Sequence, residues 1–379
     1  MRAILGDLIT PAKVIRCEDG SYPVLSMTMH DGIVLQSERF KKSLASADQS
    51  NYKVVKRGQL VVGFPIDEGV LYIQDAVDEG IMSPAYAVWD VDDRKVNRKY
   101  LELALHSDSA MQYYGSKLRG TTARRRSIPA NELLALEFLL PSMQVQEQAV
   151  KALGKVNRLI SLRQQQLAKL DELVKERFVE LFGDPMTNSN GYVLKKYGDL
   201  FELNAGGTPS KQKPEYWDDG TISWIGSNMC QNTVIYENDG NYITEEGLKH
   251  SSARMFPVDT VLIALVGATI GKTALLKFET TTNQNVLGVR GIRESGYTPE
   301  FIFYYTQGLY QKFLNIGDGG FAMASKGFIS ELPVPIVDLT LQEQFAAFVE
   351  QTDKSKLTVQ QSLDKLEVLK KSLMQQYFG

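Results

Sequence analysis

Two stretches of the chain repeat apolar residues at intervals of three and four, the spacing of one face of a long helix. They lie within residues 146–183 and 342–379. The positions on this face are Leu153, Val156, Ile160, Leu167, Leu170, Val174, Phe178 and Leu181 in the first stretch, and Phe345, Phe348, Thr352, Val359, Leu363, Leu366, Leu373 and Tyr377 in the second. Neither stretch contains proline, and Arg163 and Arg177 interrupt the first face. The pattern predicts two long helices with a coiled-coil seam.

The two stretches also repeat each other in sequence. They align without a gap at an offset of 196 residues, and 12 of 38 positions are identical. Both begin with Gln-Glu-Gln, at Gln146 and Gln342, and both end with Phe-Gly. Helices share composition by chance, but an ungapped match with identical ends indicates a duplication.

A lone helix cannot bury such a stripe in water, so we expect the two copies to pair with each other. At 1.5 Å per residue, 38 helical residues span roughly 57 Å. Residues 184–336 separate the copies and are numerous enough for a globular domain that starts at the end of one helix and returns to the start of the other. Antiparallel pairing is therefore the economical arrangement.

The remaining segments, residues 1–140 and 184–336, are predicted to be α+β domains. Both contain short β-branched runs punctuated by Gly, Asn and Asp, with few helical stretches. They resemble each other faintly, as in Gly6-Asp7-Leu8 and Gly198-Asp199-Leu200. The predicted fold is two α+β domains separated by an antiparallel pair of coiled-coil helices, residues 141–183 and 337–379. This arrangement is a dumbbell with pseudo-twofold symmetry.

Composition predicts a soluble protein of the reducing cytoplasm. Hydrophobic residues make up 43% of the chain and charged residues 23%. No apolar run reaches the roughly 18 residues that a membrane span needs, and the start of the chain has no signal-peptide layout. The two cysteines, Cys17 and Cys230, lie far apart and are expected to be buried thiols.

The net charge of −3 hides one strongly basic window in the first domain. Five cations fall within ten residues that contain no acid: Lys117, Arg119, Arg124, Arg125 and Arg126. Such a window is typical of a phosphate-binding surface and also of an ordinary solvated surface. Composition alone leaves both interpretations open.

The sequence contains no recognisable enzyme active site. The segment Gly267-Ala268-Thr269-Ile270-Gly271-Lys272-Thr273 has three residues between its glycines, whereas a phosphate-binding loop needs four. The three histidines are scattered, so neither a metal site nor a catalytic triad is expected. These observations favour a non-catalytic protein.

The order domain, helix, domain, helix, with Gln-Glu-Gln opening each helix, resembles the specificity subunits of type I restriction-modification systems. Six segments of the second domain strengthen the resemblance: Tyr197-Gly198-Asp199-Leu200-Phe201, Gly206-Gly207-Thr208-Pro209-Ser210, Tyr216-Trp217, Ile222-Ser223-Trp224-Ile225, Gly267-Ala268-Thr269-Ile270-Gly271 and Asn283-Gln284. The first domain lacks the Gly-Gly-Thr-Pro-Ser segment, which leaves its recognition surface less defined. The resemblance covers essentially the whole chain.

The resemblance implies a division of labour between this chain and its partners. Each globular domain would read one half of an interrupted double-stranded DNA site, and the helix pair would set the spacing between the halves. Two methyltransferase subunits would dock on the helices and supply S-adenosylmethionine, so this chain would carry no cofactor, metal or catalytic residue. Restriction subunits that translocate DNA can join such a complex.

Cations and short polar side chains on Gly- or Pro-bearing loops are the candidate DNA contacts. In the first domain they are Lys117, Arg119, Arg124, Arg125 and Arg126, and in the second they are Ser210, Lys211, Lys213, Ser227, Asn228, Lys272 and Lys326. Trp217 and Trp224 could stack on a base, but we expect them to belong to the core.

Two other functions fit the same sequence. The chain could be a coiled-coil scaffold whose end domains bind proteins or carbohydrate, in which case its affinity would be indifferent to salt. It could also be the specificity subunit of a related system whose partner fuses methyltransferase and nuclease. Neighbouring reading frames would distinguish that system from type I.

Overall fold

The computed structural model describes residues 1–18, 22–29, 31–39, 48–118, 126–316 and 323–379. They form two compact units: unit 1 comprises Met1–Gln164 with Gln361–Gly379, and unit 2 comprises Gln165–Gln360. Both units combine sheets with helices, so the predicted α+β class is confirmed. No described helix combines the length and the apolar character that crossing a membrane requires.

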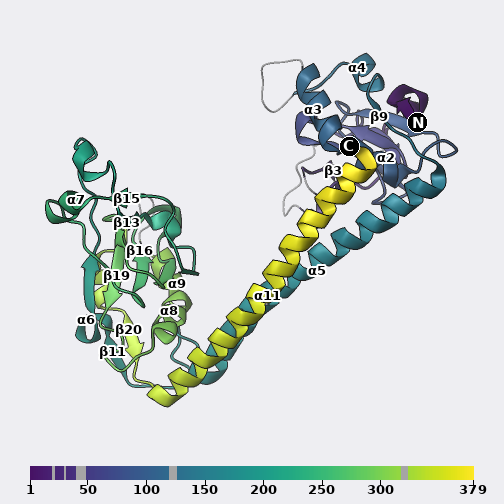
Figure 1. Cartoon of the computed structure of the whole chain (residues 1–379). Coiled ribbons are helices and arrows are strands. Elements are labelled where there is room, and N and C mark those ends of the chain that lie inside the picture. Colours follow the sequence, from purple (N-terminus) through teal and green to yellow (C-terminus); the bar gives the residue numbers. More distant parts are fainter. Residues whose placement is uncertain (19–21, 30, 40–47, 119–125, 317–322) are drawn as a thin grey trace. The chain divides into compact units, whose positions relative to one another are not determined.

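The two predicted long helices are α5 (Met143–Phe182) and α11 (Leu339–Phe378), each 40 residues long (Figure 1). Their first residues and their last residues both differ by 196, the offset that relates the two sequences. The duplication therefore reproduces the helix boundaries as well as the sequence.

The long helices pack against each other within each unit. In unit 1, Leu153 near the start of α5 shares a hydrophobic cluster with Phe378 at the end of α11. In unit 2, the ring of Phe178 near the end of α5 lies 5.3 Å from the ring of Phe345 near the start of α11. The start of one helix thus meets the end of the other in both units, which confirms the predicted antiparallel packing.

Unit 1 is built around a sheet with the strand order β2-β9-β6-β7, in which all neighbours are antiparallel. The strand pairs β1-β10, β3-β4 and β5-β8 complete its β-structure among the described residues. Its elements outside the long helices are β1 (Arg2–Ile4), η1 (Leu5–Asp7), β2 (Ile9–Pro11), β3 (Leu25–Met27), β4 (Ile33–Leu35), α1 (Gln36–Arg39), β5 (Lys53–Lys56), β6 (Leu60–Val62), η2 (Ile66–Glu68), β7 (Leu71–Ile73), β8 (Glu79–Met82), β9 (Ala87–Val91), α2 (Arg98–Leu105), α3 (Asp108–Lys117), α4 (Ala130–Leu134) and β10 (Glu137–Leu139).

Unit 2 is built around a five-stranded sheet with the order β12-β19-β16-β17-β14. A second sheet has the order β15-β13-β18, and β11 pairs with β20. Its elements outside the long helices are β11 (Leu194–Lys196), α6 (Tyr197–Leu200), β12 (Glu202–Ala205), η4 (Pro214–Tyr216), β13 (Ile222–Ile225), η5 (Ser227–Met229), β14 (Thr233–Ile235), β15 (Tyr242–Ile243), α7 (Glu245–Lys249), β16 (Val261–Ala264), η6 (Gly267–Thr269), β17 (Thr273–Leu276), β18 (Thr281–Thr282), β19 (Val286–Arg290), α8 (Pro299–Gly308), α9 (Tyr310–Leu314), α10 (Lys326–Ser330) and β20 (Pro333–Pro335).

The central strands of the two sheets correspond in order and pairing. The strand order β2-β9-β6-β7 of unit 1 matches the order β12-β19-β16-β17 within the sheet of unit 2, so that β2 corresponds to β12 and β6 to β16. Leu60, the first residue of β6, pairs with Trp89 of β9, and Val261, the first residue of β16, pairs with Val289 of β19. The faint sequence similarity of the two domains therefore reflects a shared sheet.

A buried glutamine joins each long helix to the domain that precedes it. Gln146 and Gln342, which open the repeated Gln-Glu-Gln motif, are 1% and 0% exposed. Gln146 Oε1 accepts the backbone N–H of Asn97 at 2.8 Å, and Gln342 Oε1 accepts that of Thr298 at 2.9 Å. Each Nε2 donates to a backbone carbonyl just before its own helix, at 2.9 Å and 3.1 Å. Asn97 and Thr298 are the N-caps of α2 and α8, so one amide fixes the start of two helices at once.

Replacing either buried glutamine with alanine should destabilise the protein. In Gln146→Ala or Gln342→Ala, a buried N–H loses its acceptor, and we expect the free energy of unfolding to fall by about 1–3 kcal/mol. Urea denaturation followed by circular dichroism measures this change. Gln148 and Gln344 are exposed members of the same motif, so their alanine variants should change stability by less than about 0.5 kcal/mol. Equal effects at buried and exposed positions would contradict the proposed role of the buried amides.

Candidate nucleic-acid interface

The large sheet of unit 2 gathers several connections at one end. β12 and β16 end there, whereas β19, β17 and β14 begin there. The pairing shows this directly, because Ala205 at the end of β12 lies opposite Leu287 of β19, and Thr233 at the start of β14 lies opposite Ala274 of β17. We call this end the loop end of the sheet.

Six of the seven candidates of the second domain lie on segments that leave or enter the sheet at its loop end, and Lys326 lies on a segment that passes that end. Ser210, Lys211 and Lys213 follow β12, Ser227 and Asn228 precede β14, Lys272 precedes β17, and Lys326 begins α10. The segment before α10 reaches the same end because Ala324 donates its N–H to the carbonyl of Leu265, just after β16, at 2.8 Å. The fold thus brings together residues that are more than 100 positions apart, although their contact with DNA stays a prediction.

The loop at residues 206–210 is held tightly to the sheet. Gly206 donates its N–H to the backbone carbonyl of Val286 at 3.0 Å, and Gly207 donates its N–H to the backbone carbonyl of Thr282 at 2.8 Å. A Cβ atom at Gly207 would lie 2.3 Å from the carbonyl carbon of Ser252, which no real Cβ atom can do. Glycine at position 207 is therefore required by the close approach of two backbones.

Trp217 and Trp224 anchor this loop, which corrects our expectation that they belong to the core. Both side chains are partly exposed, and their rings meet edge to face with centroids 5.2 Å apart. The Trp224 indole N–H donates to the backbone carbonyl of Gly207 at 3.1 Å. The Trp217 indole N–H donates to the backbone carbonyl of Ser210 at 3.2 Å. The two indoles therefore fix both ends of the segment that carries Thr208.

Thr208 and Gln284 form a polar pair at the loop end that we did not predict from the sequence. The Thr208 hydroxyl donates to Gln284 Oε1 at 2.5 Å, and the Gln284 side chain is exposed. The turn that carries Gln284 is also fixed, because Asn283 Oδ1 accepts the N–H of Asn285 at 3.0 Å. The amide is thus oriented before any ligand arrives. The sequence signal was present, since both segments carry the resemblance, but it did not identify the pair.

The candidate cations of unit 2 differ in their surroundings. Lys272 Nζ donates to Gln231 Oε1 at 2.8 Å, and Gln231 Nε2 donates to the carbonyl of Asn228 at 3.0 Å. Lys213 Nζ lies 2.9 Å from the hydroxyl of Tyr216, and this hydrogen bond raises the pKa of the lysine. The hydrogen-bond partners of the two amines are thus an amide and a phenol, respectively. Lys211 and Lys326 are exposed.

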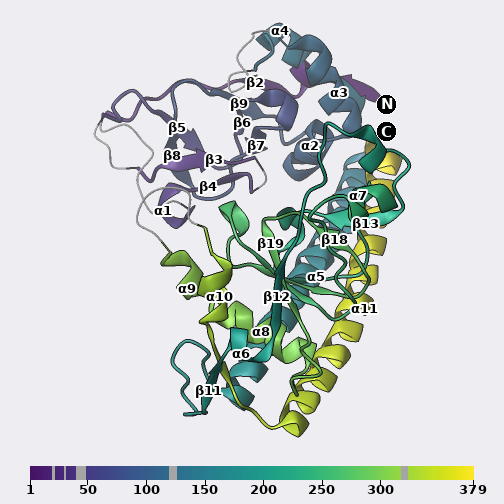
Figure 2. The ribbon, with the colours of Figure 1, turned by 90° about the vertical axis from the view of Figure 1, so that its left-hand side faces the viewer.

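The described candidates of unit 1 are both paired with acids. Lys117, at the end of α3, lies 3.1 Å from a carboxylate oxygen of Glu132 in α4, and the two helices lie next to each other (Figure 2). Arg126 lies 3.0 Å from Asp67 and 2.6 Å from Glu68. The other three candidates of this domain, Arg119, Arg124 and Arg125, lie outside the described residues.

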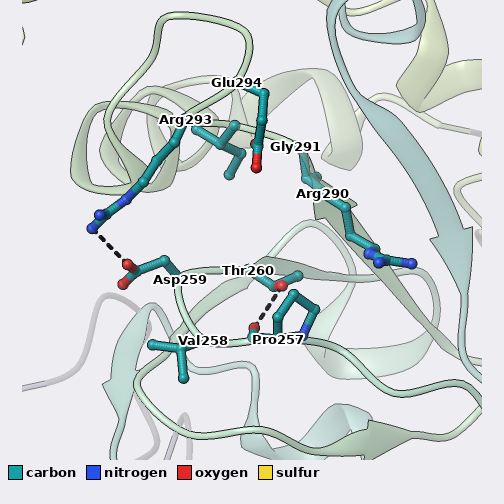
Figure 3. Close-up of a pocket in the computed structure, with 10 residues that line it drawn as sticks. Pro257, Val258, Asp259, Thr260, Arg290, Gly291, Arg293 and Glu294 are labelled. Carbon is teal, nitrogen blue, oxygen red and sulfur yellow. Dashed lines mark hydrogen bonds and ion pairs between the residues drawn. The ribbon is translucent and has the colours of Figure 1, made fainter.

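An open pocket lies at the opposite end of the large sheet in unit 2 (Figure 3). Residues 257–260 before β16 and residues 289–294 at the end of β19 line it. Its acid Asp259 pairs with Arg293 at 2.6 Å and with Lys277 at 2.9 Å, and Lys277 also pairs with Glu300 at 3.1 Å. These charges are matched within the protein. The pocket contains none of the candidate residues.

Both cysteines are free and buried, as predicted. Burial raises the pKa of Cys230 to about 12, so this thiol stays protonated and unreactive at neutral pH. Among the described residues, no group of three or more His, Cys, Asp or Glu side chains could hold a metal ion.

Comparison with known sequences places the second half of the chain in a family. Residues 190–368 match the family model of the type I restriction modification DNA specificity domain. The type I restriction enzyme EcoR124I/EcoR124II specificity subunit of Escherichia coli is 35% identical over 98 residues, which are 25% of this chain and 24% of that protein. The MjaIX specificity subunit of Methanocaldococcus jannaschii is 31% identical over 165 residues, 42% of this chain and 37% of that protein. The alignments thus span between a quarter and two fifths of the relatives' own length.

Solved structures extend the similarity to the whole chain. The type I restriction-modification S subunit from M. genitalium has a TM-score of 0.58 at 14% identity and covers 100% of this chain and 96% of that one. A chain from a structural study of assembly and conformational transition in the type I restriction-modification system has a TM-score of 0.62 at 15% identity, with 100% and 97% coverage. The chain therefore has the fold of type I restriction-modification S subunits, and its residues 190–368 match the model of the type I restriction modification DNA specificity domain.

Proposed function

We propose that this chain reads an interrupted double-stranded DNA site, one half with residues 1–140 and the other with residues 184–336. The observation that carries the proposal is that six of the seven candidates lie on segments that leave or enter the unit 2 sheet at its loop end, which the segment before Lys326 also reaches. A matching sheet recurs in unit 1 with a different set of polar side chains. Two copies of one scaffold with different loops suit the two different halves of an asymmetric site.

The side chains at the loop end have the chemistry that DNA recognition requires. Lysines contact phosphates through a compact charge, and these contacts supply most of the affinity. Amides and hydroxyls contact base edges, which supply sequence discrimination. Lys211, Lys213, Lys272 and Lys326 take the first role in this proposal, and Ser210, Ser227 and Asn228 take the second.

The long helices carry the surfaces for the methyltransferase subunits. Several apolar side chains on these helices are between 44% and 70% exposed, namely Leu159, Leu162, Leu173, Val179, Leu357, Val368 and Leu369. In this proposal the methyltransferase subunits cover these apolar side chains. The partner also brings S-adenosylmethionine and the active site, and restriction subunits join the same complex. One structural neighbour comes from a study of complex assembly in the type I restriction-modification system, which supports the proposal that this chain has partners.

Methylation mapping tests the proposed function directly. The chain is co-expressed with the methyltransferase encoded beside it, and methylated adenines are mapped across the host genome. We expect one split motif with two defined halves and a fixed gap. If a well-formed complex adds no methylation, the DNA-reading proposal is wrong, and a scaffold that binds proteins or carbohydrate becomes the better explanation.

Exchanging one domain should change one half of the motif. When residues 184–336 are replaced by the equivalent domain of another type I subunit, we expect only one half-site to change, because the other half and the helices are untouched. The matched control exchanges residues 1–140 and should change the opposite half. Methylation mapping of both chimaeras gives the result. Changes in both halves after a single exchange would contradict the division between domains.

Removing the loop anchors should weaken reading by the second domain. Trp224→Phe and Trp217→Phe keep the aromatic ring but remove the N–H that holds residues 207 and 210, at an expected cost of about 1 kcal/mol each in binding. That cost corresponds to an approximately fivefold loss of affinity for the mapped site, measured by fluorescence anisotropy. The control is Trp89→Phe in unit 1, because the buried Trp89 indole N–H has no partner among the described residues. An equal loss in all three variants would mean that the indole hydrogen bonds do not matter.

A further inference from the structure

The turn after β6 in unit 1 carries two acids that Arg126 holds. Asp67 and Glu68 lie in η2, and the Arg126 guanidinium binds one with each terminal nitrogen, at 3.0 Å and 2.6 Å. The backbone is joined as well, because Ile66 donates its N–H to the carbonyl of Arg126 at 3.1 Å. The contact is half-buried, since the Arg126 and Asp67 side chains are 31% and 14% exposed. The two segments are therefore joined by both backbone and side-chain bonds, whereas an exposed ion pair forms and breaks freely.

The opposite side of the same turn is fixed by His106. Gly69, directly after η2, has a φ of +77° and presents its carbonyl to His106 Nε2 at 2.9 Å. The His106 ring stacks on Tyr72 with centroids 5.0 Å apart, and its Nδ1 lies 2.7 Å from the carbonyl of Glu102. The turn is therefore held from both sides, by His106 through the backbone and by Arg126 through the two acids.

The corresponding turn of unit 2 has no charge. β6 matches β16, and the turn that follows β16 is η6, which consists of Gly267, Ala268 and Thr269. That turn lies at the loop end of the sheet, three residues before the candidate Lys272. By this correspondence, Asp67 and Glu68 occupy the part of unit 1 where the proposed function places DNA. Two unpaired carboxylates at such a place would repel phosphates.

We propose that Arg126 is a positioning residue that neutralises and holds the turn of Asp67 and Glu68, and that it does not itself contact a phosphate. The inference rests on the proposed function, because it concerns the half-site that unit 1 reads. The planar guanidinium fork suits two neighbouring carboxylates, and both terminal nitrogens are already occupied by them. Lys117 is paired in a similar way with Glu132. The basic window of the sequence is therefore neutralised at both of its described ends.

A rescue experiment separates positioning from phosphate contact. The full chain is co-expressed with its methyltransferase, and affinity is measured on a duplex carrying the motif that methylation mapping returns. Arg126→Gln leaves two acids unpaired, and we expect affinity to fall about tenfold, which corresponds to about 1.4 kcal/mol. In the triple variant Asp67→Asn, Glu68→Gln, Arg126→Gln, the acids are gone as well, and affinity should return to within about threefold of the wild type.

The salt dependence of the triple variant provides the second readout. A lost phosphate contact lowers the slope of log affinity against log salt by about 0.9, whereas a lost positioning residue leaves the slope unchanged. Lys211→Gln, at a proposed phosphate contact of unit 2, is the reference for a genuine loss of slope. A triple variant that stays as weak as Arg126→Gln, with a reduced slope, would overturn the inference and make Arg126 a phosphate contact.

Two controls keep the result interpretable. If Arg126→Gln lowers the unfolding temperature too far for binding measurements, Arg126→Lys replaces it, because lysine keeps the charge but lacks the planar fork that binds each acid through a separate nitrogen. We expect Arg126→Lys to have a reduced affinity for the mapped site. Adding Asp67→Asn and Glu68→Gln to this variant should restore the affinity. A wild-type complex without sequence-specific methylation would defeat the proposed function itself, whereas normal methylation without rescue defeats only the inference about Arg126.

Discussion

Neither long helix can keep its apolar stripe out of water alone, and this constraint governs how each unit is built. A 40-residue helix extends about 60 Å, far beyond the reach of one small core. Each unit therefore uses the start of one helix and the end of the other. Phe378, almost the last residue of the chain, packs its ring 4.9 Å from Tyr100 in unit 1. The core of unit 1 is thus incomplete until the final helix has formed. An ion pair of 2.7 Å between Lys356 and Asp171 adds a charged contact between the two helices inside unit 2.

Helix packing alone does not determine how a helix leaves its domain, and the buried glutamines supply this second constraint. An amide can donate and accept at once, so Gln146 and Gln342 each satisfy a backbone N–H of the domain and a carbonyl before the helix. A glutamate could not donate from its ionised form, and an asparagine is one methylene shorter. This explains why the first residue of the motif recurs at the offset of 196, whereas its exposed third residue has no such requirement.

The features that could be predicted from the sequence are those that depend on local spacing. The long helices followed from a periodic stripe, and the loops of the second domain followed from glycine, proline and short polar residues close to strand ends. The contacts that could not be predicted join positions far apart in sequence. The hydrogen bond between Gln231 and Lys272 joins positions 41 residues apart, and the one between Arg126 and Glu68 joins positions 58 residues apart. The window that contains Arg126 looked strongly basic because the acids that pair with it lie outside the window, in η2 and in α4. The two tryptophans were misjudged because an indole is both apolar and a hydrogen-bond donor, and the sequence did not reveal which property the fold uses.

The two units show how one scaffold can carry two different polar surfaces. The sheets agree in strand order and pairing, and the long helices agree in both boundaries, since these features depend on buried apolar positions and backbone hydrogen bonds. The turn after the third strand of the shared order is free of that constraint. It is uncharged in unit 2 and carries two acids in unit 1. A cation from another segment matches the two acids of unit 1, because neighbouring carboxylates without a counter-charge repel each other. The charged turn of unit 1 thus differs from its counterpart together with the segment that faces it, because Arg126 pairs with Asp67 and Glu68.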